Sequence, residues 1–246
     1  MDPLDQTSLL CDPFYVLKEL KGSDKKGHQI VEPGQIVWAH QVYLTAQPFV
    51  IEIRGYDPRD ESKNTYVFAK YDASATPRPH FPVKELNLRS DENLYVMYGK
   101  RRPAVVLQTV STDFYNQQNP EPYVWVAPCF TFREKHKLSY RVKIAAMEMP
   151  HLFYLPAHAS GLSEPSVLRF EHIQPVAAAG VQPLLKSNLQ RSLLSDDVWA
   201  ILQHRLHLFV SGRVLDPVLE ETLAAYRECI NDAYCSTGDS SVNQPA

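Results

Sequence analysis

The chain has 246 residues, enough to bury a sizeable core in one or two domains, and its 44% hydrophobic and 22% charged residues are ordinary for a globular protein. No apolar run is long enough to cross a bilayer, and acidic residues stand near the start where a secretory signal needs Lys or Arg. We therefore expect a cytoplasmic protein that is neither exported nor bound to a membrane. The four cysteines form no CxxC pair, which indicates reduced thiols.

Charge is distributed unevenly along the chain, although the formal net charge is only −3. Residues 99–143 hold eight Lys and Arg against three acidic residues, whereas residues 195–246 hold three Arg against eight acidic residues. A basic segment followed by an acidic one fits an anionic ligand, or an internal mimic of such a ligand. Two solvated faces of opposite sign would give the same counts, so charge alone leaves both interpretations open.

The first hundred residues predict an extension, a strand and a hairpin. Residues 1–30 contain one short apolar run and a polar, Lys-rich loop. After a Pro-Gly turn, residues 35–44 predict a strand. The segments 48–57 and 64–73 are rich in β-branched and aromatic residues and are separated by a polar stretch, so we expect them to pair as a hairpin.

Four further strands are predicted in the middle of the chain. Residues 102–110 and 123–132 form nearly continuous apolar runs, which are typical of strands buried on both faces. Residues 138–147 alternate apolar and polar side chains and predict a third strand, and residues 166–176 predict a fourth. Successive short strands of this kind favour a β-barrel or a β-sandwich.

The last quarter of the chain predicts two helices. Ser195 is expected to cap the first, and Gly212 to end it. Asp216 and Pro217 are expected to open the second as the cap and the first helical residue. Long and apolar side chains recur at helical spacing along both segments, at Val198, Ile201, Leu202, Arg205 and Phe209 and then at Leu219, Leu223, Tyr226, Ile230 and Ala233.

Five short motifs occur in the same order as in the MazF/PemK toxin family, which this chain resembles. They are PGQIVW at 33–38, RRPAVVL at 101–107, VAPCFT at 126–131, SVL and EHIQP within 166–175, and LSDDV at 194–198. The second motif is the most characteristic of the family. Together the motifs make the resemblance extend over residues 33–45 and 99–212.

The resemblance implies a mainly β fold with C-terminal helices, built on a small SH3-like barrel of the CcdB/PemK type. The barrel would span residues 31–212 and carry a long insertion, residues 46–98, after its first strand. Residues 1–30 would be an N-terminal extension. Residues 213–246 would add a further helix and a disordered tail.

The resemblance also implies a metal-independent endoribonuclease toxin that cleaves single-stranded RNA without a cofactor, usually as a homodimer. In this chemistry the RNA 2′-hydroxyl is the nucleophile, and the protein supplies positioning, a cation and proton transfer. Arg102, the motif arginine at the start of a buried strand, and Thr131 would be the catalytic residues. The implied RNA-binding residues are Lys100, Arg101, Arg133, Lys135, His136 and Lys137. Without the motif, an exposed Arg102 that pairs with a neighbouring carboxylate fits the sequence equally well.

Departures from the family pattern support a second hypothesis, a catalytically degenerate barrel that binds and sequesters a protein partner such as an antitoxin or a regulator. Phe130 stands where the family has Thr, and a shift of one residue turns Thr131 to the opposite face of the strand unless a bulge intervenes. No acidic residue lies between Asn93 and Arg102, where the family often has one. A double-stranded DNA binder is disfavoured because no candidate recognition helix is basic.

Other conspicuous residues favour structural roles. His204 and His207 lie three residues apart on the first predicted helix, and no third metal ligand is evident, so we expect both to face solvent. Trp38 and Trp125 lie on predicted strands and are expected to pack in the core. Cys129 is expected to be a small buried hydrophobe.

Overall fold

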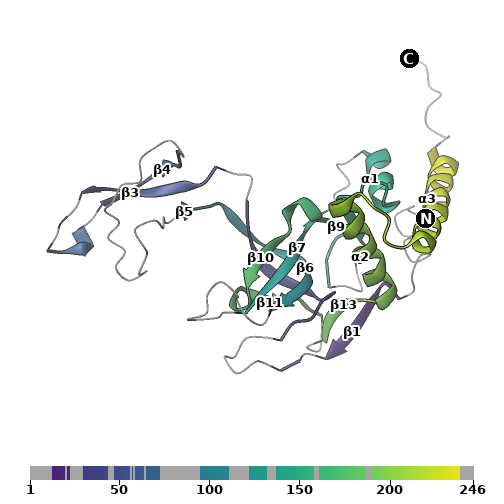
Figure 1. Cartoon of the computed structure of the whole chain (residues 1–246), viewed down its shortest axis with the longest axis horizontal. Coiled ribbons are helices and arrows are strands. Elements are labelled where there is room, and N and C mark those ends of the chain that lie inside the picture. The colour runs from purple at the N-terminus through teal and green to yellow at the C-terminus, as the bar shows by residue number, and fades with distance from the viewer. Residues whose placement is uncertain are drawn as a thin grey trace, which may run out of the picture. The chain divides into compact units, whose positions relative to one another are not determined.

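The chain folds into two compact units in the computed structural model, one made of Met1–Gln41 with Arg101–Ala246 and the other of Val42–Lys100 (Figure 1). The residues that the structure describes are 13–19, 21–22, 30–43, 47–55, 57, 59–63, 65–72, 95–110, 122–131, 137–157, 161–186 and 190–238. The smaller unit includes the segment 46–98 that the resemblance sets apart as an insertion. No helix in the described part of the chain is long and apolar enough to span a membrane.

The larger unit contains a seven-stranded sheet in the order β11-β2-β6-β7-β9-β8, with β10 also paired to β7. Its strands are β2 (Ile36–Val42), β6 (Gly99–Val110), β7 (Tyr123–Thr131), β8 (Leu152–Leu155), β9 (Ser166–Arg169), β10 (Gln174–Ala177) and β11 (Val181–Pro183). Strands β6 and β7 lie inside the sheet and match the two apolar runs, so the prediction of buried strands there is confirmed. Val105, Val106, Val126 and Ala127 are completely buried.

A second sheet of the larger unit pairs the N-terminal strand with strands that directly precede the C-terminal helices. It consists of β1 (Tyr15–Glu19), β13 (Gln190–Leu194) and β12 (Leu185–Lys186), with β13 in the middle. Strands β1 and β13 pair antiparallel, with Tyr15 opposite Leu194. The described strands form open antiparallel sheets and no closed barrel, so the fold that the structure supports is mainly β with C-terminal helices.

The prediction of a strand at residues 138–147 is wrong, because Leu138–Ala145 forms helix α1. Its buried residues are Val142, Ile144 and Ala145, and the C-cap residue Ala146 is also buried, so Val142, Ala145 and Ala146 have the i, i+3, i+4 spacing of a helix. Val142 and Ala146 pack against Tyr226 and Ile230 of helix α3 (Pro217–Gly238). Over so short a segment, the apolar residues fit both the alternation of a strand and the spacing of a helix. The packing against α3 stabilises the helix.

Residues 166–176 form two short strands rather than the single strand predicted. Between β9 and β10, the residues Phe170–His172 form the 3-10 helix η4. Strand β9 pairs with the end of β7, placing Val167 opposite Phe130, whereas β10 pairs with the start of β7. The helical turn therefore lets two adjacent segments pair with different parts of one strand.

Helix α2 (Asp196–Ser211) and helix α3 confirm the predicted signals for helix starts and stops. The Ser195 hydroxyl accepts a hydrogen bond from the Val198 amide at the start of α2. Gly212 ends α2 with φ +68°. The Asp216 carboxylate accepts hydrogen bonds from the amides of Val218 and Leu219 and so caps α3.

The smaller unit is a three-stranded antiparallel sheet in the order β4-β3-β5. Its elements are β3 (Phe49–Gly55), the 3-10 helix η2 (Glu61–Lys63), β4 (Thr65–Lys70) and β5 (Tyr95–Val96). Strands β3 and β4 are the predicted hairpin, which is confirmed.

Candidate functional site

Arg102 stacks on an aromatic ring of the neighbouring strand. It lies near the start of β6 and is half-buried, and its guanidinium carbon is 4.6 Å from the centroid of the Phe130 ring on β7. A guanidinium over a ring face is held there by the ring quadrupole. Phe130, the residue that departs from the family pattern, therefore supports the guanidinium of the motif arginine.

Two further residues contact the same ring because β9 and η4 follow the end of β7. The guanidinium carbon of Arg169 is 5.2 Å from the Phe130 centroid, and the imidazole centroid of His172 is 5.5 Å from it. We call Arg102, Phe130, Arg169 and His172 the Phe130 cluster. Beside it, Glu171 accepts a hydrogen bond from Arg169 Nε at 2.7 Å.

The Phe130 cluster keeps its imidazole neutral. Burial lowers the pKa of His172 from its ordinary value of 6.5, and the charges of Arg169 and Arg102 lower it further, while Glu171 opposes them. At neutral pH the cluster thus combines two cations with an imidazole that can accept a proton. Such a set of groups can bind a phosphate and take a proton from a neighbouring hydroxyl.

Thr131 lies outside the Phe130 cluster. Successive strand residues point to opposite faces, and the pairing of β7 with β9 is regular from Cys129 to Thr131, with Thr131 opposite Ser166. Thr131 instead lines a cavity of about 80 Å³ together with Trp38, Glu164 and Ser166. No bulge at this point brings its hydroxyl to Arg102.

The other implied site residues are distributed over several places. Arg101 is exposed, with its guanidinium carbon 5.3 Å from the Trp38 ring and a hydrogen bond to Gln182. Lys100 on β6 and Lys137 beside the start of α1 are exposed. Arg133, Lys135 and His136 lie outside the described residues. Trp38 and Trp125 are half-buried, and Trp38 packs against the main core.

Sequence reasoning missed Arg169 and His172. Both lie in the run Arg169-Phe170-Glu171-His172, where three polar side chains interrupt the segment predicted as one strand. This interruption of the apolar pattern could have predicted a turn between two strands, with its polar side chains exposed for a functional role. Cys129 is buried as expected, and burial raises the pKa of its thiol, so it is a poor nucleophile at neutral pH.

Comparison with known proteins adds no family to this picture: neither a protein-family model nor a curated protein sequence matches the chain. Among the residues that the structure describes, no group of three or more His, Cys, Asp or Glu is placed to hold a metal ion. The chemistry of the Phe130 cluster is therefore the main evidence for function.

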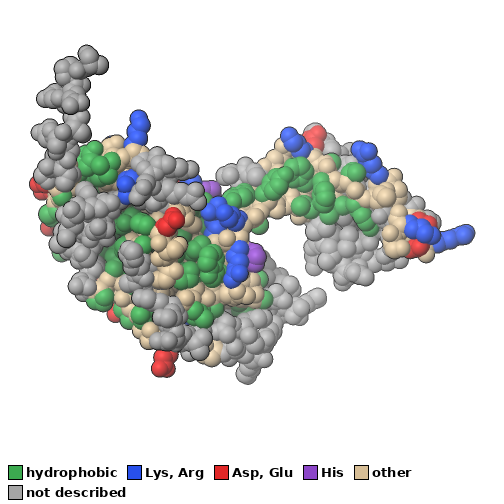
Figure 2. Space-filling model, turned by 180° about the vertical axis from the view of Figure 1, so that it is seen from behind, with side chains coloured by type: hydrophobic (Ala, Val, Ile, Leu, Met, Phe, Trp, Pro, Cys, Tyr) green, Lys and Arg blue, Asp and Glu red, His purple; other side chains and the backbone are tan. Residues whose placement is uncertain are grey.

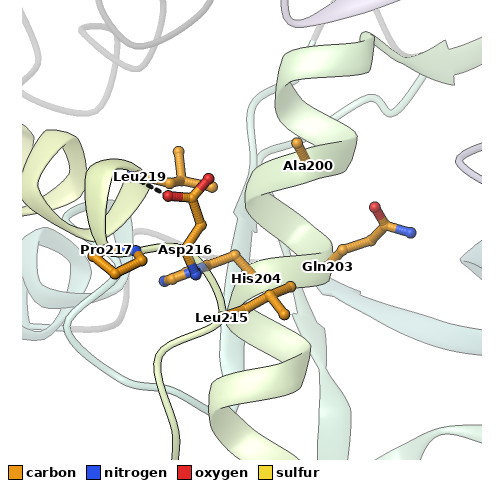
Figure 3. A pocket seen from close by; sticks show the side chains of 7 residues that line it. All are labelled: Ala200, Gln203, His204, Leu215, Asp216, Pro217 and Leu219. Carbon is orange, nitrogen blue, oxygen red and sulfur yellow. Dashed lines mark hydrogen bonds between the residues drawn. The ribbon is translucent and has the colours of Figure 1, made fainter.

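A second hollow lies where α2 meets α3, and it has a volume of about 380 Å³ (Figure 3). The expectation that His204 faces solvent is wrong, because its side chain lines this hollow and is 0% exposed. Its Nε2 lies 2.7 Å from Glu220 Oε2, and its Nδ1 accepts a hydrogen bond from the Asp216 amide at 3.3 Å. Both ring nitrogens are therefore engaged by the start of α3.

Glu220 connects this histidine to one arginine, Arg227. It accepts a hydrogen bond from Arg227 Nη1 at 2.8 Å as well as the one from His204. Burial would raise the pKa of Glu220, but the hydrogen bonds from His204 and Arg227 and the Arg227 charge more than offset it, so this pKa is lowered. Arg205 is only 2% exposed, and burial and the nearby Arg227 charge lower its pKa to about 10. The polar groups here hold α2 and α3 together, and we assign them a structural role.

Proposed function

We propose that this protein is a divergent relative of the MazF/PemK toxins that binds single-stranded RNA and cleaves it at the Phe130 cluster. The observation that carries the proposal is the placement of Arg102, Arg169 and the neutral His172 around one aromatic ring. The order of the five sequence motifs supports the same kinship, including an SH3-like barrel core. The basic residues near Arg102 would bind neighbouring phosphates.

The cluster supplies what cleavage through the 2′-hydroxyl requires. His172 accepts the proton of the 2′-hydroxyl, whose oxygen attacks the adjacent phosphorus. The bond from O2′ to phosphorus forms and the bond from phosphorus to O5′ breaks, which leaves a 2′,3′-cyclic phosphate and a 5′-hydroxyl. Arg102 and Arg169 balance the negative charge that grows on the phosphate oxygens, and the leaving O5′ takes a proton from water or from protonated His172.

The test is an assay on short single-stranded RNA in EDTA with the wild type, Arg102→Ala and Arg213→Ala. The wild type should form products that end in a cyclic phosphate. Loss of a preorganised cation should slow cleavage by about 10²–10³-fold in Arg102→Ala. Arg213 is exposed between α2 and α3, so Arg213→Ala is the matched control and should cleave at the wild-type rate.

A DNA strand of the same sequence separates this mechanism from others, because it lacks the nucleophile. It should bind without being cut. Cutting of DNA and RNA at equal rates would rule out the 2′-hydroxyl mechanism, and a wild type that cuts no RNA would rule out the nuclease.

A protein partner is the second candidate, favoured by an apolar surface at the connection between α2 and α3. Val210 and Val218 are 75% and 72% exposed, and Val214 and Leu215 between them are also exposed. Exposed apolar patches commonly mark protein contacts. If this surface joins two copies of the chain, sedimentation should show a dimer for the wild type and a monomer for Val210→Ser with Val218→Ser.

A further inference from the structure

The sheet of the smaller unit presents three exposed aromatic side chains on one face, whereas Tyr95, paired with Val50, lies on the other. Cross-strand partners lie on the same face, and the register pairs Phe49 with Lys70 and with Val96, and Ile51 with Phe68. Tyr66 lies two residues before Phe68 on β4 and shares that face. The Tyr98 ring is edge-on to Phe49, with centroids 5.6 Å apart at an interplanar angle of 90°. We call Phe49, Tyr66, Phe68 and Tyr98 the aromatic face.

Three rings of the aromatic face are open to solvent. Tyr66, Phe68 and Tyr98 are 48%, 66% and 62% exposed, whereas Phe49 and Ile51 on the central strand are half-buried. Hydrophobic side chains gather along this unit in the space-filling view, with charged side chains of both signs at its margins (Figure 2). Large aromatic side chains are normally buried, so several exposed on one small sheet indicate a ligand contact.

Lysines on this face and next to it favour an anionic ligand. Among the described strand positions that the register assigns to the face, Lys70 is the one charged residue, and it is exposed. In the sequence, Tyr98 is followed two residues later by Lys100, which belongs to the same unit. Aromatic rings on an open sheet, flanked by cations, are suited to stack the bases of a single-stranded nucleic acid while the cations bind its phosphates.

We infer that the aromatic face is a second contact surface for single-stranded RNA, with bases stacked on Tyr66, Phe68 and Tyr98. Residues two apart on a strand are separated by about 7 Å, which leaves each ring of β4 able to take its own base. The inference rests on the proposed function for its ligand. It concerns binding, however, and binding can be measured without cleavage.

The test uses full-length protein and a fluorescent single-stranded RNA with 2′-O-methyl groups, which cannot be cleaved through O2′. In fluorescence anisotropy, Tyr66→Ala with Phe68→Ala should weaken binding by about 10- to 100-fold, since each base stacked on an aromatic ring contributes substantially to affinity. Phe68→Trp should keep the affinity. Tyr140→Ala, which removes an exposed tyrosine from α1 of the other unit, is the matched control and should bind as the wild type does.

Salt dependence separates stacking from charge. The double aromatic variant should keep the wild-type slope of log affinity against log salt, whereas Lys70→Ala should reduce the slope by about 0.7 for one lost phosphate contact.

The outcomes also separate this inference from the proposed nuclease. Wild-type affinity in the double aromatic variant would overturn the inference while leaving cleavage at the Phe130 cluster untouched. Weakened binding together with a wild type that cuts no RNA would support the aromatic face and reject the nuclease. The alternative is self-association of the wild type through this face. If the double aromatic variant binds RNA as the wild type does but no longer self-associates, the face is a protein contact and the inference is overturned.

Discussion

His172→Gln should slow RNA cleavage by about 10²–10⁴-fold, the usual contribution of a general base, while RNA binding stays close to that of the wild type. Glutamine is similar in size but cannot accept the 2′-hydroxyl proton at neutral pH. The two cations of the cluster remain in the variant, so its affinity for phosphate is retained. Single-turnover cleavage and anisotropy with 2′-O-methyl RNA measure the two quantities separately. Equal losses in both would show that His172 positions the RNA and does not transfer a proton.

The pH dependence of this reaction follows from the lowered pKa of His172. The base must be neutral, so kcat/KM should rise with pH and level off above a pKa that lies below 6.5. Arg169→Ala removes the charge that contributes most to the lowering and leaves Glu171 without its partner, and both changes raise the pKa. The acid limb should therefore move to higher pH in Arg169→Ala and stay in place in Arg213→Ala. If the acid limb of kcat/KM lies at the same pH in Arg169→Ala as in the wild type, the ionisation of His172 does not control the rate.

Glu220→Ala should lower the free energy of unfolding by about 2–3 kcal/mol, because it removes the partner of the buried His204 and leaves Arg205 beside Arg227. The value is taken below that of a fully buried pair because Glu220 is partly exposed. Urea denaturation measures the change. Glu221→Ala, at the exposed neighbouring position of α3, should change stability by no more than about 0.5 kcal/mol.

Acidic pH should weaken the contact between α2 and α3 that Glu220 makes. The pKa of Glu220 is lower in the folded protein than its ordinary value of 4.5, so its contribution is complete above pH 4.5 and is lost as the pH falls through the folded value. In Glu220→Gln the difference in stability between neutral and acidic pH should shrink. Equal stability of Glu220→Ala and Glu221→Ala at neutral pH would contradict the role assigned to this network.

The parts of the fold that local chemistry determines could be predicted from the sequence. The apolar runs of β6 and β7 specify buried strands, and Ser195, Gly212 and Asp216 specify where helices start and stop. The period of a strand also indicates that Thr131 points away from the face of Phe130. These features depend on neighbouring residues alone.

The parts that depend on distant contacts could not be predicted in this way. Helix α1 is selected by its packing on α3, eighty residues later in the chain, where Tyr226 donates a hydrogen bond to the Ala145 carbonyl. His172 reaches Phe130 because β9 and β10 pair with different parts of β7. His204 is buried because α3 begins against it. In each case the position of a side chain depends on which distant segments contact one another. The periodicity of apolar residues within one segment does not contain that information.

The pairing of β1 with β13 has a consequence for how the chain folds during synthesis. Tyr15 lies opposite Leu194, so the first strand meets its partner only after about 180 further residues have been made. At the usual 5–20 residues per second this takes roughly 10–40 s, during which the edge of β1 is open to other chains. The Phe14 carbonyl also accepts a hydrogen bond from the Ser195 amide at the start of α2, so docking of the N-terminal strand and completion of the helix start belong to the same late step. A bulky fusion close to Pro13 should slow that step and increase aggregation of the newly made protein, without altering the Phe130 cluster.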